Sequence, residues 1–214
     1  HINILFSHFH WDHIQGFPFF APVFNEKYSI TLIGESKMNF TLEQLFTNQL
    51  MFPYFPVSLE DLNAKINFHE IKRCNNIKIK DVTIKLARLN HPGGCIGYRI
   101  EYGGKSLVYA TDTEHFSCVD KSLLKLALNA DVLIYDCNYT EDEYSGKIGP
   151  PRTHWGHSTW TQGVKIAKAA NVKKFILFHH DPAHDDKFVA KIERDARKEF
   201  KKSYAAYEGM ELSL

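Results

Sequence analysis

Short apolar runs alternate along the chain with longer segments in which apolar residues recur every three or four positions. Apolar or β-branched runs of four to eight residues, bounded by polar or glycine-rich turns, predict strands. Such runs cover residues 1–7, 29–34, 66–71, 82–89, 98–102, 106–110, 132–135 and 174–178. Gly103 and Gly104 lie between two of these runs and predict a hairpin there, because paired glycines suit a tight turn.

Amphipathic spacing predicts helices over residues 40–50, 121–129, 159–170 and 187–202. Thr41 followed by Gln44 indicates a capping box for the first helix, and Ser158 or Thr159 is the expected cap of the third. The Lys and Arg residues of the last helix predict a solvated face. Strands and hairpins early in the chain, with helices interspersed later, indicate a mixed α/β layered fold in one domain, residues 1–214.

Two segments are expected to be irregular. Residues 51–57 carry aromatic residues interrupted by prolines and cannot be helical, so this loop either packs on the core or faces a substrate. A polar turn is expected around Asn75 and Asn76.

Composition narrows the class of protein. The chain has 214 residues, 44% of them hydrophobic, which is enough for a sizeable core. A net charge of +1 argues against a surface built to coat nucleic acid, which needs clustered Lys and Arg. The chain contains no apolar run of 18 residues, so we expect no membrane span. Its four cysteines form no CxxC pair, which favours a reduced, cytoplasmic protein.

The densest chemistry lies in residues 7–13, which contain His8, His10, Asp12 and His13. The preceding apolar run predicts a strand, so the cluster begins where that strand ends. If the strand extends this far, His8 and His10 share a face and can reach one ion. Asp12 and His13 would follow on the turn and reach a second ion. The segment is therefore a candidate two-metal site.

Further histidines and acids follow predicted strands, where loops on a rigid scaffold carry function. They are His91, Asp112, Asp136, His179 and His180. His154 and His157 lie immediately ahead of the helix predicted over residues 159–170. A single histidine is more often a satisfied polar residue than a ligand, and this interpretation applies to His1, His69, His115 and His184. Nitrogen and oxygen ligands without thiolates suit zinc, manganese or iron.

With His8-x-His10-x-Asp12-His13 followed by His91, Asp112 and His179, the chain resembles the metallo-β-lactamase-fold hydrolases. The resemblance implies an αββα sandwich and two divalent metal ions, zinc by preference, with manganese or iron as alternatives. By resemblance, His8, His10 and His91 hold one ion, Asp12, His13 and His179 the other, and Asp112 bridges them. His180 is the alternative to His179. Residues 207–212 resemble the closing strand of the family.

Gly156-His157-Ser158-Thr159 resembles a motif of the phosphodiesterase branch, which includes tRNA 3′-processing endonucleases and cyclic-phosphate phosphodiesterases. In that branch the histidine pairs with an acid after an earlier strand, and Asp136 occupies the matching place. Such a carboxylate orients the imidazole and favours its protonated form, so that it can protonate a leaving alkoxide. We therefore expect His157, Asp136 and Asp12 to act in catalysis. Asp136 as a simple turn or cap residue is the alternative.

Two departures from the family refine the expectation. Members usually have two or more strands and an Asp-x-Gly segment before the HxHxDH strand, and this chain has none. We therefore expect either that the sequence is a truncated or processed piece, or that a second copy or a separate segment completes the first sheet. The basic, Gly/Pro-rich insertion that the tRNA-processing enzymes use as a substrate arm is also absent. A small substrate is therefore favoured over nucleic acid.

The sequence thus predicts a phosphodiesterase for small or cyclic phosphodiesters that acts through a metal-bridging hydroxide. One alternative is thioester or lactone hydrolysis on the same ions, against which the Asp136–His157 pair argues mildly. The other is a metal-binding sensor or regulatory domain without turnover.

Overall fold

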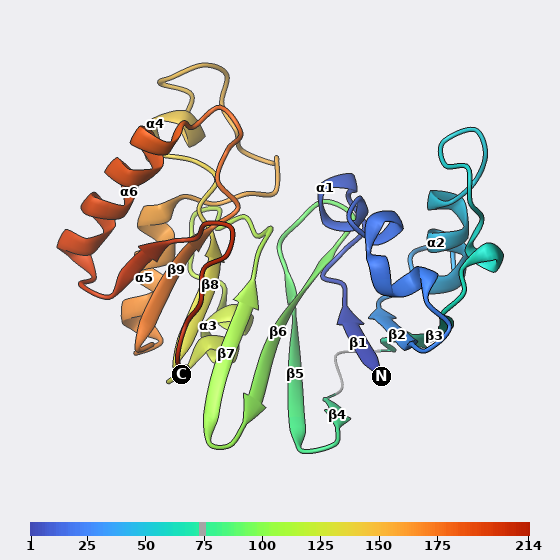
Figure 1. Cartoon of the computed structure of the whole chain (residues 1–214). Coiled ribbons are helices and arrows are strands. Elements are labelled where there is room, and N and C mark those ends of the chain that lie inside the picture. Colours follow the sequence, from blue (N-terminus) through green and yellow to red (C-terminus); the bar gives the residue numbers. More distant parts are fainter. Residues whose placement is uncertain (73–75) are drawn as a thin grey trace. The chain divides into compact units, whose positions relative to one another are not determined.

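The computed structural model describes residues 1–72 and 76–214. The chain divides into two compact units, His1–Asn75 (unit 1) and Asn76–Leu214 (unit 2). Figure 1 shows the helices and strands of both units. Among the described residues, no helix has the length and apolar character needed to cross a membrane.

Unit 1 is built on a three-stranded parallel sheet with the strand order β1-β2-β3. The strands are β1 (Ile2–Leu5), β2 (Ser29–Gly34) and β3 (Lys65–Glu70). Between them lie the helices α1 (Trp11–Ile14) and α2 (Leu42–Gln49) and the 3₁₀ turns η1 (Phe17–Phe19), η2 (Ala21–Phe24) and η3 (Leu59–Asp61). The fully buried ring of Phe46 on α2 contacts Phe6 and Phe17 edge-on, at centroid distances of 4.9 and 4.8 Å.

The capping box predicted for the first helix is confirmed. The Thr41 hydroxyl accepts the Gln44 N–H at 3.1 Å, and the Gln44 side chain accepts the Thr41 N–H at 2.9 Å. Two N–H groups that the helix cannot satisfy internally are thereby paired. The boundaries of α2 follow from this local chemistry.

Unit 2 contains a seven-stranded sheet with the order β10-β9-β8-β7-β6-β5-β4. Its strands are β4 (Ile77–Ile79), β5 (Val82–Leu89), β6 (Cys95–Tyr102), β7 (Lys105–Ala110), β8 (Val132–Asp136), β9 (Lys174–Phe178) and β10 (Ser203–Ala205). Strands β4 to β7 are antiparallel neighbours, and β7 to β10 are parallel. The predicted hairpin is the β6–β7 pair, closed at Tyr102 and Lys105.

Three helices cover one face of this sheet (Figure 1). Helix α3 (Lys121–Ala127) packs on β5, β6 and β7, α5 (Trp160–Ala169) on β8 and β9, and α6 (Asp186–Glu199) on β10. The short helix α4 (Glu141–Tyr144) follows β8. The core between helices and sheet includes Leu123, Leu133, Val164 and Phe175, all buried. The mixed α/β fold expected from the sequence is confirmed.

Some predicted boundaries are wrong. Residues 207–212 form no strand; the Met210 N–H instead bonds the Tyr207 carbonyl in a turn that contains Gly209 at φ +79°. The last strand is β10, whose three residues are too short to give a pattern. Helix α6 ends at Glu199 rather than 202, because Phe200 is extended (φ −139°). Strand β4 was not predicted from the sequence. Asn75, one of the two residues of the predicted polar turn, lies outside the described residues.

The proline-broken loop at residues 51–57 is not helical, as predicted. Its side chains divide between the two roles left open by the sequence. Phe55 and Val57 pack against the core of unit 1. Phe52 and Tyr54 are 85% and 74% exposed. Phe55 and Val57 therefore hold the loop against unit 1, whereas Phe52 and Tyr54 are exposed, and a substrate-facing role for them stays a prediction.

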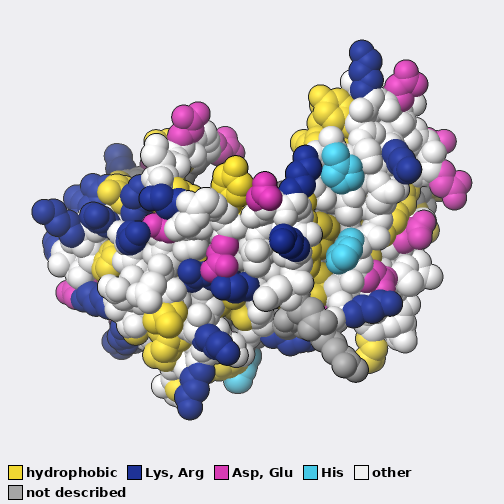
Figure 2. Space-filling model, turned by 90° about the horizontal axis from the view of Figure 1, so that it is seen from below, with side chains coloured by type: hydrophobic (Ala, Val, Ile, Leu, Met, Phe, Trp, Pro, Cys, Tyr) yellow, Lys and Arg dark blue, Asp and Glu magenta, His cyan; other side chains and the backbone are white. Residues whose placement is uncertain are grey.

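Charged side chains of both signs share the surface. On the face shown in Figure 2, Lys and Arg side chains lie among Asp and Glu side chains. On α6, Lys191 and Lys198 both pair with Asp195, and Arg197 pairs with Glu193. The basic residues of this helix thus form the solvated face that the sequence predicts.

His115 is a polar residue enclosed in unit 2. Its Nδ1 atom lies 3.0 Å from the Ser158 hydroxyl, which also accepts the Tyr135 O–H at 2.8 Å. Its ring lies 4.3 Å from the Tyr144 ring, centroid to centroid. Burial lowers the pKa of His115, opposed in part by the negative charges of Glu141 and Glu114. The neutral imidazole is therefore the form that fits the folded protein.

Replacing Gly163 with alanine should destabilise the protein, although alanine normally favours a helix. A Cβ at this position of α5 would lie 2.5 Å from Phe175 Cζ and 2.7 Å from Tyr135 Cδ1. Overpacking of this kind costs about 1–3 kcal/mol. Urea unfolding of Gly163→Ala measures the loss. Gly16→Ala is the control, because a Cβ there meets nothing within 4 Å and stability should stay within about 0.5 kcal/mol.

His115→Gln should make stability less sensitive to acid. A histidine whose folded pKa is lowered binds fewer protons in the folded than in the unfolded state, so stability falls as the pH drops below about 6.5. Glutamine does not titrate and can still bond Ser158. Thermal unfolding at pH 7.5 and pH 5.5 should show a smaller acid loss in the variant than in the wild type and in the exposed-residue control His69→Gln. Equal losses in all three proteins would contradict the expectation.

Candidate metal centre

The first ligand cluster lies in unit 1, directly after β1. His8 is buried, and its ring lies 4.6 Å from His10 and 4.2 Å from His13, centroid to centroid. His13 Nε2 is 3.1 Å from Asp12 Oδ2. Three imidazoles and one carboxylate therefore share a small region of unit 1.

The backbone brings them together in a different way from the one predicted. Strand β1 ends at Leu5, so His8 and His10 do not share a strand face. Instead, His10 is the N-cap residue of the single-turn helix α1, which carries Asp12 and His13. The Gln49 amide donates to the Ile14 carbonyl at 2.8 Å and fixes the end of this turn.

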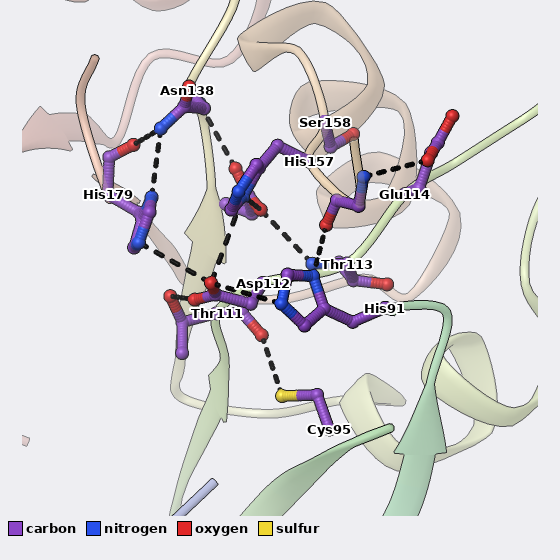
Figure 3. Close-up of polar contacts among 12 residues, drawn as sticks. His91, Cys95, Thr111, Asp112, Thr113, Glu114, Asn138, His157, Ser158 and His179 are labelled. Carbon is purple, nitrogen blue, oxygen red and sulfur yellow. Dashed lines mark hydrogen bonds and ion pairs between the residues drawn. The ribbon is translucent and has the colours of Figure 1, made fainter. Parts of the chain in front are cut away.

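The second cluster lies at one edge of the unit 2 sheet. Strands β7, β8 and β9 are parallel, and β5 runs in the same direction because it is antiparallel to β6, which is antiparallel to β7. The carboxyl ends of all four strands therefore meet at one edge, where open α/β sheets carry their sites. From these ends come His91 (β5), Asp112 (β7), Asp136 (β8) and His179 (β9). Figure 3 shows His91, Asp112 and His179 converging there.

Asp112 is buried at the centre of this cluster. Its Oδ2 atom is 3.8 Å from His91 Nε2, 3.5 Å from His179 Nε2 and 3.9 Å from His157 Nδ1. These separations are longer than a good hydrogen bond. Two ligand atoms that each lie about 2.0–2.2 Å from one tetrahedral ion are about 3.5 Å apart, which resembles the observed spacing.

The donor set fits divalent metal ions. Within unit 2, ligand atoms of His91, Asp112 and His157 lie within 4.8 Å of one another, as do those of Asp136, His157 and His179. All are imidazole nitrogens or carboxylate oxygens, which suit zinc, manganese or iron. His157 belongs to both groups, so its role as a ligand or as a proton donor needs an experiment.

Two residues of the cluster have a left-handed backbone, with φ +53° at Asp112 and φ +58° at His179. Such conformations are uncommon in residues other than glycine and cost about 1–3 kcal/mol when they persist in a fold. The Thr111 hydroxyl donates to Asp112 Oδ1 at 2.6 Å and holds the carboxylate in place. The backbone is thus strained at two positions from which side chains point into the cluster.

His157 and Asp136 are in contact. His157 Nδ1 lies 3.0 Å from Asp136 Oδ2, and the carboxylate is fully buried. Asp136 also accepts the N–H groups of Thr113 and Asn138, both at 3.1 Å. The carboxylate is therefore fixed by backbone donors, and the imidazole is oriented by the carboxylate. Gly156 places His157 just before α5, whose N-cap is Thr159, one of the two caps predicted.

Of the two alternatives His179 and His180, it is His179 whose ring nitrogen lies near Asp112 among the described residues, with Nε2 3.5 Å from Asp112 Oδ2. On its other side, Asn138 Nδ2 lies 2.9 Å from both the ring Nδ1 and the carbonyl oxygen of His179. The amide donates to the carbonyl, so Nδ1 accepts and the ring proton is on Nε2. Binding an ion through Nε2 would require this proton to move to Nδ1 and the Asn138 amide to turn.

The sequence did not indicate a role in the site for Asn138 or Glu114, or the structural role of Gly156. Each lies within two residues of a predicted site residue, which was the available signal. Glu114 is buried and accepts hydrogen bonds from the backbone N–H groups of His154 and Gly156. The Gly156 carbonyl in turn lies 2.8 Å from His91 Nδ1 (Figure 3). These residues support the site rather than supply its ligands.

Comparison with known proteins identifies the family. Residues 2–180 match the family described as "Beta-lactamase superfamily domain". A curated relative, "Ribonuclease Z" of Sulfurisphaera tokodaii, is 26% identical over 238 residues, covering 94% of this chain and 76% of the relative.

Solved structures show the same fold. The metallo-β-lactamase fold protein YhfI from Bacillus subtilis superposes with a TM-score of 0.70 at 21% identity, covering 97% of this chain and 75% of that one. A diphosphatase from the PhnP family gives a TM-score of 0.68 at 20% identity, with coverage of 99% and 71%. The chain belongs to the β-lactamase superfamily and is a hydrolase-type protein of the metallo-β-lactamase fold.

Proposed function

We propose that this chain is a metal-dependent phosphodiesterase. The observation that carries the proposal is the contact of 3.0 Å between His157 Nδ1 and the buried Asp136, beside the Asp112 carboxylate. Hydrolysis of a phosphodiester needs a proton for the leaving oxygen, and an imidazole oriented by a carboxylate can supply it. The ribonuclease Z relative and the fold neighbour named as a diphosphatase support chemistry at phosphorus.

The motif assigns seven residues to two divalent ions, which we take to be zinc. They are His8, His10, Asp12, His13, His91, Asp112 and His179. Within unit 1 the structure groups the first four, and within unit 2 it groups the last three, which supports the assignment. Bound ions would lower the pKa of a water molecule and neutralise charge on the phosphoryl oxygens.

The protein's own groups would act as follows. The Asp136 carboxylate would accept a hydrogen bond from the Nδ1–H of His157, so that the proton for the leaving oxygen comes from Nε2. Thr113 and Asn138 hold the carboxylate in position through their N–H groups. Asp12 would take part as a ligand next to the attacking water, as the motif implies.

Small or cyclic phosphodiesters are the substrates we favour, because the net charge of the chain is only +1 and, on the face shown in Figure 2, Lys and Arg side chains lie among acidic ones. RNA is the second candidate, favoured by the relatives named ribonuclease Z. A thioester or lactone would not need the Asp136–His157 pair, and a sensor domain would need no turnover.

Zinc-loaded protein should hydrolyse bis-p-nitrophenyl phosphate and at least one cyclic nucleotide, and chelation with EDTA should abolish both activities. A parallel assay with precursor tRNA, a thioester and a lactone separates the alternatives. Activity on RNA alone would replace the small-substrate proposal. Turnover of the thioester or lactone without any phosphodiesterase activity would overturn the reaction class, and no turnover of any substrate would favour the sensor.

His157→Ala should reduce kcat about 10²–10⁴-fold on a phosphodiester with a poor alkoxide leaving group, the usual range for loss of a general acid. The loss should be much smaller with p-nitrophenolate, which leaves without protonation. Asp136→Asn should show the same leaving-group dependence with a smaller loss.

Zinc content, measured by inductively coupled plasma mass spectrometry, should be unchanged in His157→Ala. His154→Asn is the control, because asparagine tolerates the φ of +70° at this exposed neighbour, and its activity should be normal. Loss of zinc from His157→Ala would instead make His157 a ligand.

A further inference from the structure

Glu114 is a buried carboxylate that lies two residues beyond Asp112. Its Oε1 atom accepts the His154 N–H at 2.8 Å and the Tyr144 O–H at 2.7 Å. Its Oε2 atom accepts the Gly156 N–H at 2.9 Å (Figure 3). Among the described residues, no Lys or Arg forms an ion pair with it. Its charge is therefore balanced by N–H and O–H donors, two of which belong to the loop that leads to His157.

The backbone of Glu114 is tied to the residue before His91. Its N–H donates to the Asn90 carbonyl at 2.7 Å, and the Asn90 amide donates to the Glu114 carbonyl at 3.3 Å. One residue thus links the end of β5 with the loop before α5. These two segments carry His91 and His157.

Gly156 continues the link to both histidines. Its carbonyl accepts the His91 Nδ1–H at 2.8 Å, which leaves Nε2 as the nitrogen with a lone pair, on the side of Asp112. Its backbone has φ +88°, and a Cβ there would lie 2.3 Å from His91 Nδ1. The peptide that orients His91 is also the peptide that joins Gly156 to His157. A shift of this peptide would therefore move both imidazoles.

We propose that Glu114 is a positioning residue that holds Gly156 by its N–H, and through the carbonyl of the same residue fixes the tautomer of His91 and the position of His157 against Asp136. The proposal rests on the proposed function only in taking His91 as a metal ligand and His157 as the proton donor. The hydrogen bonds of Glu114 and Gly156 predict the tautomer in the metal-free protein whatever the reaction is.

The test compares Glu114→Gln with Tyr144→Phe. Glutamine has one carbonyl oxygen, so its NH₂ group must face either the Gly156 N–H or the His154 N–H. Tyr144→Phe removes one hydrogen bond from the same carboxylate but leaves both loop amides paired. The two variants therefore separate support of the loop from simple loss of a buried hydrogen bond.

Three measurements decide the outcome. Nitrogen-15 spectra of the imidazoles in metal-free protein should show His91 fixed as the Nδ1–H tautomer in the wild type and in Tyr144→Phe, and as a mixture in Glu114→Gln. Zinc affinity should fall about 10–100-fold in Glu114→Gln, as for other residues that support metal ligands. With an active substrate, kcat should fall while KM stays within about twofold.

A folded Glu114→Gln protein with an unchanged His91 tautomer and unchanged zinc affinity would overturn the proposal. If that variant does not fold, Glu114→Asp carries the test, because it keeps the charge but withdraws the carboxylate by one methylene, and the same changes should be smaller in size. Absence of phosphodiesterase activity in the wild type would refute the proposed function alone, since the spectra and the zinc titration need no substrate.

Discussion

The common direction of β5, β7, β8 and β9 is the constraint on which the unit 2 site depends. Because these strands end at one edge, residues separated by more than 80 positions in the sequence are brought together there. One face of these strands packs on the helices through buried apolar side chains, so the scaffold resists movement. Polar side chains that converge on one place lie at or just beyond the strand ends, and those positions carry His91, Asp112, Asp136 and His179. The apolar core thus determines where the chemistry can be.

That arrangement explains what could be predicted from the sequence and what could not. Continuous apolar runs predicted β2, β5 and β9 with their observed boundaries, since such runs depend only on local pattern. Likewise, the capping box of α2 is a contact between residues three apart. Strands β4 and β10 have three residues each and are defined by pairing with a neighbour, which no local pattern contains. Residues 207–212 look like a strand by composition but form a turn.

In the candidate site, too, local pattern indicates some residues, and others depend on contacts between distant parts of the chain. His91, Asp112, Asp136 and His179 could be selected because they follow predicted strands, and the motif added an order and a spacing. Glu114 could not be assigned a role, because its donors are 40 and 42 residues away along the chain. Asn138 likewise depends on a contact with His179, 41 residues away. Supporting residues of this kind are defined by how loops meet, and a single sequence does not contain that information.

Three buried carboxylates lie in one region of unit 2 and bear on what this region can bind. Asp112, Asp136 and Glu114 are all buried, and Asp136 and Glu114 are held by N–H and O–H donors that carry no full positive charge, apart from His157 when it is protonated. Such a region attracts cations and repels a phosphodiester anion. For the proposed phosphodiesterase, bound divalent cations would reverse the local charge and allow an anionic substrate to approach. Asp112 and His179, which both have a left-handed backbone, point their side chains into this region (Figure 3). The donor set of this region suits cations, and the proposed action on a phosphodiester depends on their binding.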